Sequence, residues 1–101
     1  MRFEMLVGLN VIDDEKYQEY RKAMHPILSG FDGDFGYDFK IAEVLLSQTI
    51  DTINRVFTIN FPDKETLEAF FSNPEYLKVK EQYFEKSVES TTLISGYDKD
   101  G

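Results

Sequence analysis

The chain has 101 residues, no cysteine, and 19 acidic against 11 basic residues, which gives it a formal net charge of −8. This length predicts one domain, and the absence of cysteine excludes disulfides, thiolate metal sites and thiol nucleophiles. The basic residues never cluster as contact with a phosphate backbone requires, so we expect no nucleic-acid partner. No apolar run approaches the ~18 residues of a membrane span, and no signal-peptide pattern opens the chain, so we expect a cytoplasmic protein without a membrane partner.

The first predicted elements are a strand and an amphipathic helix. Residues 2–12 alternate with a period of two, and one side of the strand is wholly apolar, with Phe3, Met5, Val7, Leu9 and Val11. Asp13 is placed to cap a helix of about four turns, whose apolar stripe consists of Tyr17, Tyr20, Met24, Ile27 and Leu28. Because Pro26 lacks a backbone donor, we expect the helix to kink or end there, with Ser29-Gly30 as its exit.

A second and a third strand follow. Residues 35–46 alternate again, which predicts a long strand with Phe35, Tyr37, Phe39, Ile41 and Glu43 on one side. Residues 47–53 are polar enough to form a hairpin connection. The third strand spans residues 55–61, and Pro62 ends it because proline cannot donate a hydrogen bond to the sheet.

Two helix starts and a fourth strand complete the chain. Asp63 caps a helix that carries Leu67, Phe70 and Phe71, and Asn73-Pro74 begins a further helix with a cap followed by proline. Residues 88–97 have little helix preference and predict a strand, and residues 98–101 predict a frayed tail. This order predicts a single α+β domain over residues 1–97 with the ferredoxin-like βαββαβ fold, a four-stranded antiparallel sheet and a split second helical segment.

Three groups of residues carry a resemblance to a known family. They are the strand end Phe61-Pro62-Asp63, the junction Phe70-Phe71-Ser72-Asn73-Pro74-Glu75-Tyr76, and the helix residues Tyr17, Tyr20, Arg21 and Pro26. Together they resemble the domain of unknown function 1330 family over about residues 3–97. The resemblance implies a ferredoxin-like protomer of the dimeric α/β-barrel superfamily, in which two sheets pack face to face. Two positions depart from the family pattern, because Asp32-Gly33 replaces paired glycines and Gln48-Thr49 replaces a Glu-Gly pair.

The residue pattern predicts a homodimer independently. Opposite the apolar strand faces lie mixed faces with Leu6, Gly8, Asn10, Ala42, Val44, Val56, Thr58, Asn60, Thr92 and Ile94. Such faces suit a partner sheet with enclosed water or ligand. Asn10 and Asn60 carry amides that need hydrogen-bond partners when buried, and these partners are symmetry mates, water or a ligand. We predict ligand contacts for Asn10 and Asn60, together with Thr58 and Arg55.

Three residues are candidates for catalysis. His25 is the sole histidine and would titrate near neutral pH as a general base, whereas the alternative is a half-exposed side chain at a helix end. Tyr37 and Asp38 would orient or deprotonate a small substrate together with Arg55. The alternative for this second group is cross-strand ion pairing on an exposed edge.

A metal and a nucleotide cofactor are not expected. Asp32, Asp34 and Glu43 match the first, third and twelfth positions of a calcium loop, but Tyr37 stands where that loop requires glycine. The glycines are isolated, so no phosphate-binding loop is present.

Two functions follow from these features. The first is a small homodimeric barrel that binds or transforms a small organic molecule without metal. The second is a non-enzymatic module for protein interaction or structure. An enclosed cavity lined by Asn10, Asn60 and Asp38 favours the first, and a filled barrel with an apolar outer patch favours the second.

Overall fold

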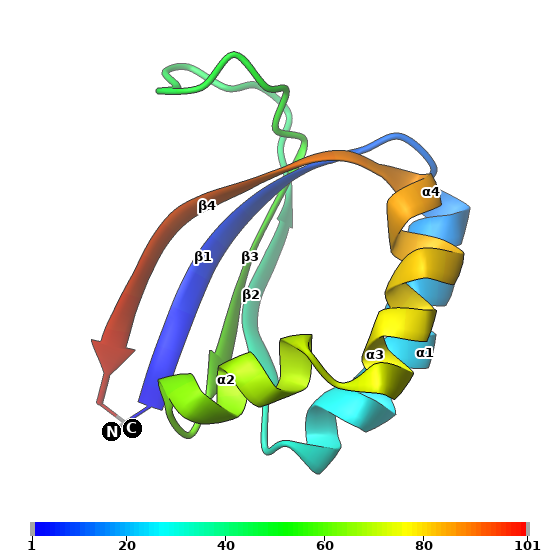
Figure 1. Cartoon of the computed structure of the whole chain (residues 1–101). Coiled ribbons are helices and arrows are strands. Elements are labelled where there is room, and N and C mark those ends of the chain that lie inside the picture. Colours follow the sequence, from blue (N-terminus) through cyan, green and yellow to red (C-terminus); the bar gives the residue numbers. More distant parts are fainter. Residues whose placement is uncertain (1, 101) are drawn as a thin grey trace.

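One four-stranded antiparallel sheet forms the centre of the molecule, and the helices lie on one of its faces (Figure 1). The computed structural model describes residues 2–100. The elements are β1 (Arg2–Val11), α1 (Asp14–Gly30), β2 (Asp34–Lys40), β3 (Arg55–Phe61), α2 (Lys64–Phe71), α3 (Pro74–Val79), the π-helical segment η1 (Lys80–Phe84), α4 (Glu85–Ser87) and β4 (Val88–Lys99). The strand order β2-β3-β1-β4 is that of the predicted ferredoxin-like fold.

Local side-chain caps begin the helices where the sequence predicts them. Three side chains each accept a hydrogen bond from the backbone N–H three residues later: Asp13 from Lys16, Asp63 from Thr66, and Asn73 from Tyr76. α1 does not end at Pro26 but continues to Gly30. The reason is packing, because Met24 and Leu28 on either side of Pro26 are fully buried and outweigh the single hydrogen bond that proline removes.

β2 differs from its predicted form in length and in the direction of its side chains. It ends at Lys40, and residues 41–54 form a loop, whereas the sequence pattern predicts a strand to residue 46. Phe35 pairs with Ile59 and Asp38 pairs with Phe57, so Gly36 and Tyr37 both lie opposite Thr58 in a β-bulge. The Tyr37 N–H donates to Thr58 Oγ1 at 2.8 Å.

The bulge reverses the predicted alternation. Phe35 lies on the helix-covered face, as predicted. Asp38 also lies on this face, and Tyr37 lies on the opposite face, whereas the alternation predicts the reverse for these two residues. A side chain at position 36 would place its Cβ only 2.5 Å from Thr58 Oγ1, so Gly36 is needed for this close approach. β4 also extends through Asp98 and Lys99, two residues that the sequence pattern assigns to a frayed tail.

The core lies between the sheet and the helices. The sheet contributes the apolar side of β1 and β3 that the alternation predicts, and the helices contribute Tyr17, Tyr20, Met24, Leu28, Leu67, Phe70 and Tyr76. Phe70 is the centre of an aromatic cluster with Phe31, Phe61, Phe71 and Tyr76. Among residues 2–100, no helix combines the length and apolar character that a membrane crossing requires.

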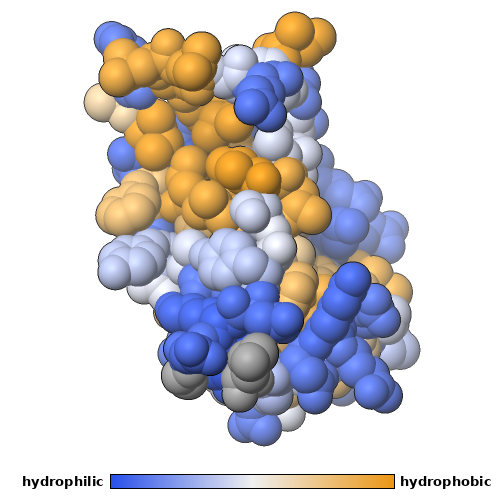
Figure 2. All heavy atoms as spheres, turned by 90° about the vertical axis from the view of Figure 1, so that its left-hand side faces the viewer, coloured by the Kyte–Doolittle hydropathy of each residue, from blue (hydrophilic) through white to orange (hydrophobic). Residues whose placement is uncertain are grey.

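The other face of the sheet is left uncovered by the helices and is apolar over much of its area. Figure 2 shows this side, with hydrophobic side chains gathered over its upper half and hydrophilic ones below. Ile94 lies on this surface, and the loop of residues 41–54 adds exposed Leu45, Leu46 and Ile50. A hollow of about 730 Å³ lies between the loop and the sheet. We call this surface the open face.

Candidate functional site

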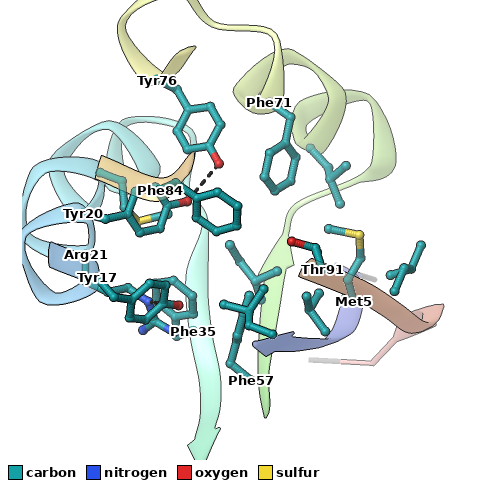
Figure 3. Close-up of a pocket in the computed structure, with 16 residues that line it drawn as sticks. Met5, Tyr17, Tyr20, Arg21, Phe35, Phe57, Phe71, Tyr76, Phe84 and Thr91 are labelled. Atoms are coloured by element: carbon teal, nitrogen blue, oxygen red, sulfur yellow. Dashed lines mark hydrogen bonds between the residues drawn. The ribbon is translucent and has the colours of Figure 1, made fainter. Parts of the chain in front are cut away.

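A cavity of about 290 Å³ lies between the helices and the covered face of the sheet (Figure 3). Its walls are mostly apolar, because β1 and β3 turn their buried aliphatic and aromatic side chains toward it. The helices contribute Phe71 and Phe84, and β4 contributes Thr91 and Leu93. Phe84 belongs to η1, the π-helical segment that follows α3. The cavity is large enough for a small organic molecule and offers few polar groups.

Two buried tyrosines form one polar part of the wall of this cavity. The hydroxyl oxygens of Tyr20 and Tyr76 lie 2.8 Å apart and share a hydrogen bond, as the dashed line in Figure 3 marks. Burial raises the pKa of Tyr20 well above its ordinary value, and the neighbouring Tyr76 raises it further. Burial also raises the pKa of Tyr76, against the lowering effect of its hydrogen bond with Tyr20.

Both phenols therefore remain protonated at neutral pH. Whichever hydroxyl donates to the other, the accepting hydroxyl keeps one hydrogen that can be donated onward. Both side chains line the cavity, so an acceptor bound beside their hydroxyls would be placed to receive this hydrogen.

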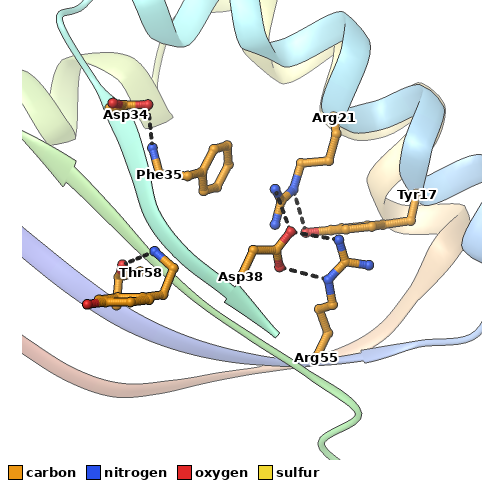
Figure 4. A network of polar contacts seen from close by, with 8 residues as sticks. Tyr17, Arg21, Asp34, Phe35, Asp38, Arg55 and Thr58 are labelled. Atoms are coloured by element: carbon orange, nitrogen blue, oxygen red, sulfur yellow. Dashed lines mark hydrogen bonds and ion pairs between the residues drawn. The ribbon is translucent and has the colours of Figure 1, made fainter. Parts of the chain in front are cut away.

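A charged network lies beside the cavity (Figure 4). Arg55 donates to both carboxylate oxygens of Asp38, from Nε and from Nη2, each at 2.8 Å. Arg21 donates from Nη1 to Asp38 at 3.3 Å and from Nε to the Tyr17 hydroxyl at 2.8 Å. The Arg21 guanidinium also lies 3.9 Å from the ring centroid of Phe35.

The network keeps Asp38 ionised. Burial favours the neutral acid, but the hydrogen bond from Arg55 and the charges of Arg21 and Arg55 outweigh it, so the pKa of Asp38 lies below its ordinary value of 3.8. Burial raises the pKa of Tyr17, although the Arg21 and Arg55 charges act in the opposite direction. An ion-paired carboxylate with a lowered pKa is a weak base, so the network suits orientation better than proton abstraction.

Ionised Asp38 is expected to stabilise the fold in a pH-dependent way. Because its pKa is lower in the folded than in the unfolded chain, the stabilisation is present above the unfolded value and is lost as the pH falls through the folded value. Urea unfolding of Asp38→Asn should therefore vary less than that of the wild type between about pH 5 and about pH 2. Asp51→Asn, in the exposed loop, is the matched control. Equal pH dependence in Asp38→Asn and the wild type would contradict this assignment.

The structure separates most of the residues that the sequence pattern singles out. Asn60 pairs with Glu4, and Asn10 lies six residues further along β1, which is about 20 Å at ~3.3 Å per residue. Asn60 accepts from Arg2 Nε at 2.7 Å, and Asn10 contacts Asn54 and Glu89 at 3.3 Å each. Both asparagines therefore have protein partners at opposite ends of the open face.

The remaining candidates are also dispersed. Thr58 and Tyr37 lie on the open face at the bulge, and His25 lies exposed on α1 beside Lys22 and Pro26. Among these candidates, the side chains of Arg55 and Asp38 form an ion pair, and the backbone of Tyr37 meets the side chain of Thr58. Among the described residues, no group of three His, Asp or Glu side chains is placed to hold a metal ion.

Sequence reasoning did not single out Tyr20, Tyr76 or Arg21 as site residues. Tyr17 and Tyr20 recur at helical spacing, which is typical of a core stripe and gives no sign of a cavity. Tyr20 and Tyr76 are 56 residues apart in the chain, so only the tertiary structure brings their hydroxyls together.

The fold and the partly open cavity define a small ferredoxin-like α+β domain with room for a ligand between its sheet and its helices. The chain belongs to the family described as Domain of unknown function (DUF1330), whose model matches residues 5–97. No curated protein matches the chain significantly.

Several solved structures share the fold. A protein of unknown function from Rhodopseudomonas palustris has a TM-score of 0.79 at 16% identity, with 99% of this chain and 83% of that chain covered. A DABB family protein with a ferredoxin-like fold from Mesorhizobium loti has a TM-score of 0.66 at 17% identity, with coverage of 99% and 98%. A dimeric ferredoxin-like protein of unknown function from Bacteroides fragilis has a TM-score of 0.62 at 14% identity, with coverage of 97% and 96%. At these identities the likeness shows the fold alone.

Proposed function

We propose that this protein binds a small, largely apolar organic molecule in the cavity between the sheet and the helices. The ligand carries one oxygen, as a carbonyl or hydroxyl group, that accepts a hydrogen bond from the Tyr20–Tyr76 pair. The observation that carries the proposal is an apolar cavity of about 290 Å³ with this pair as a buried donor in its wall. A buried phenol hydrogen without an acceptor is costly, and a ligand oxygen removes that cost.

The lining favours binding over acid–base chemistry. The polar side chains described around the cavity belong to tyrosine, arginine and threonine, and none of these lining residues is a carboxylate or a histidine. The raised pKa values of Tyr20 and Tyr76 make them hydrogen-bond donors at neutral pH. Recognition by apolar contact and one hydrogen bond requires no metal.

Acetophenone and ethylbenzene form a matched pair of probes, because they have similar shapes and only acetophenone carries a carbonyl oxygen. We expect the wild type to bind acetophenone about threefold to tenfold more tightly, which corresponds to one net hydrogen bond. The double variant Tyr20→Phe/Tyr76→Phe should lose this preference and still bind both probes. Chemical-shift titration by NMR measures both affinities.

Tyr83→Phe is the control for this experiment, because Tyr83 is half-buried and does not line the cavity. Absence of saturable binding of either probe to the wild type would contradict the proposal. A preference for acetophenone that survives in the double variant would contradict the role of the phenol pair.

We further propose that a second copy of the chain covers the open face. Its exposed apolar area supports this, since isolated soluble domains rarely leave a contiguous patch of that kind in water. Dimeric assembly is also part of the description of the Bacteroides fragilis protein with this fold. In such a dimer, the predicted ligand contacts of Asn10, Asn60 and Thr58 would lie between the two sheets. These contacts stay a prediction. A cytoplasmic location also stays a prediction. An interaction module for other proteins is the alternative use of this face.

A further inference from the structure

A second, polar hollow lies at the end of the helix–sheet layer where the loop of residues 41–54 begins and ends. It measures about 200 Å³ and is lined by Val11, Asp14, Lys40, Ile41, Asn54 and Arg55. It shares no lining residue with the aromatic cavity between the sheet and the helices. It is therefore a separate site with its own chemistry.

Arg55 lines this hollow and has an unused donor. The residue is only 8% exposed, and its two bonds to Asp38 fix the plane of the guanidinium. The remaining nitrogen, Nη1, makes no hydrogen bond to any residue between 2 and 100, and Figure 4 shows it pointing away from Asp38. A rigid and nearly buried cation with a free donor is a preformed place for an anion.

The charge of the network formed by Arg21, Asp38 and Arg55 also indicates a site for an anion. Arg21 and Arg55 share the single carboxylate of Asp38, so two positive charges meet one negative charge. Arg21 Nη2 is a further buried donor without a hydrogen-bond partner among the described residues, and it lies among aromatic rings. Buried cations are stable when they are paired, so the network as a whole is short of one negative charge.

Lys40 supplies a second cation at the same hollow. It is the residue of β2 that pairs with Arg55 across the sheet. Its side chain is 72% exposed, and its Nζ lies 4.0 Å from Asp14 Oδ2, which is the limit of an ion pair. Lys40 can therefore turn to a bound anion at little cost. Asp14 is the one carboxylate lining the hollow, and it competes with such an anion.

Asn54 forms a fixed wall beside these charges. Its Oδ1 accepts from the Val11 N–H at 2.8 Å, and its Nδ2 donates to the Val11 carbonyl at 2.9 Å. Its backbone carbonyl accepts from Ile41, which closes the base of the loop. The site is thus held by the sheet and by both ends of the loop.

We propose that Arg55 and Lys40 form a binding site for a small oxyanion, the carboxylate of an organic acid or a phosphate group. Arg55 Nη1 donates to one oxygen of the anion, and Lys40 approaches it from the solvent side. The anion would bind at this hollow whether or not a ligand occupies the cavity between the sheet and the helices.

Calorimetric titration with benzoate, inorganic phosphate and the neutral analogue benzamide tests the site. We expect benzoate or phosphate to bind at about millimolar concentration, benzamide not to bind at the hollow, and added salt to weaken binding. Lys40→Gln should weaken anion binding about threefold to tenfold, and Asp14→Asn should strengthen it, because it removes the competing charge.

Lys78→Gln is the matched control, because it removes one positive charge from an exposed position on α3. It should leave anion binding unchanged. Absence of binding of both anions to the wild type would overturn the proposal. Equal affinities in Lys40→Gln, Lys78→Gln and the wild type would also overturn it, since the anion would then bind elsewhere. Binding of only one of the two anions supports the site and identifies its preferred group.

Discussion

Replacing Phe70 with alanine is expected to lower the free energy of unfolding by about 3–5 kcal/mol, the range for removing a buried aromatic side chain. Phe70 is 0% exposed. Its ring centroid lies 4.4 Å from that of Tyr76, 5.0 Å from Phe71 and 5.4 Å from Phe61. These contacts join α2 to α3 and to β3, so the cavity left by alanine would be surrounded by side chains that cannot all move inward. Urea denaturation at one fixed protein concentration measures the loss.

Leu77→Ala is the control for this substitution. Leu77 lies on α3 and is 45% exposed, so its truncation should change the free energy of unfolding by less than about 1 kcal/mol. A similarly small change in Phe70→Ala would show that the aromatic cluster does not form the centre of the core.

An aspartate at position 94 is expected to convert the proposed homodimer to a monomer. Ile94 is 47% exposed and belongs to the apolar part of the open face. In a two-fold symmetric interface each substitution occurs twice, so Ile94→Asp would place two carboxylates in apolar surroundings. We expect the dimer affinity to fall by at least about 100-fold. Light scattering on a sizing column measures the mass at micromolar concentration.

Leu77→Asp is the matched control for the dimer, because Leu77 has a similar exposed fraction but lies on α3, on the helical side of the molecule. This variant should keep the dimer mass. A monomer mass for the wild type, or dissociation by Leu77→Asp and not by Ile94→Asp, would contradict the assignment of the open face. A monomeric wild type would favour the use of this face for another protein.

The sequence is a sufficient guide to those parts of the fold that depend on neighbouring residues. Asp13, Asp63 and Asn73 cap helices through a side chain that reaches only three residues along the chain. The alternation of β1 and β3 identifies the covered face correctly, since both strands are regular over the paired segment. These local signals, in their order, specify the ferredoxin-like fold.

The sequence is a poor guide where distant residues decide the structure. The bulge at Gly36 and Tyr37 includes a hydrogen bond to Thr58. The shift in register at this bulge places Asp38 on the covered face, beside Arg55. The alternating sequence pattern of β2 continues beyond Lys40, but the residues of the loop there do not pair with a strand of the sheet. The distance between Asn10 and Asn60 depends on strand register, which the sequence does not specify, and the register of β1 and β3 places them far apart.

The candidate site illustrates the same limit. Tyrosines at helical spacing are read as core, and both Tyr20 and Tyr76 are indeed buried. Their hydroxyl contact and the empty space beside it arise from the packing of α1 against α3. No pattern within either helix encodes that contact.

A crystal structure of the protein grown with acetophenone would show whether the cavity holds a ligand beside the two tyrosine hydroxyls. We expect density for the ligand in the cavity between the sheet and the helices, with its carbonyl oxygen within hydrogen-bonding distance of the Tyr20 or Tyr76 hydroxyl. Density only on the open face or in the hollow beside Lys40, with the cavity filled by its own side chains, would contradict the proposed binding.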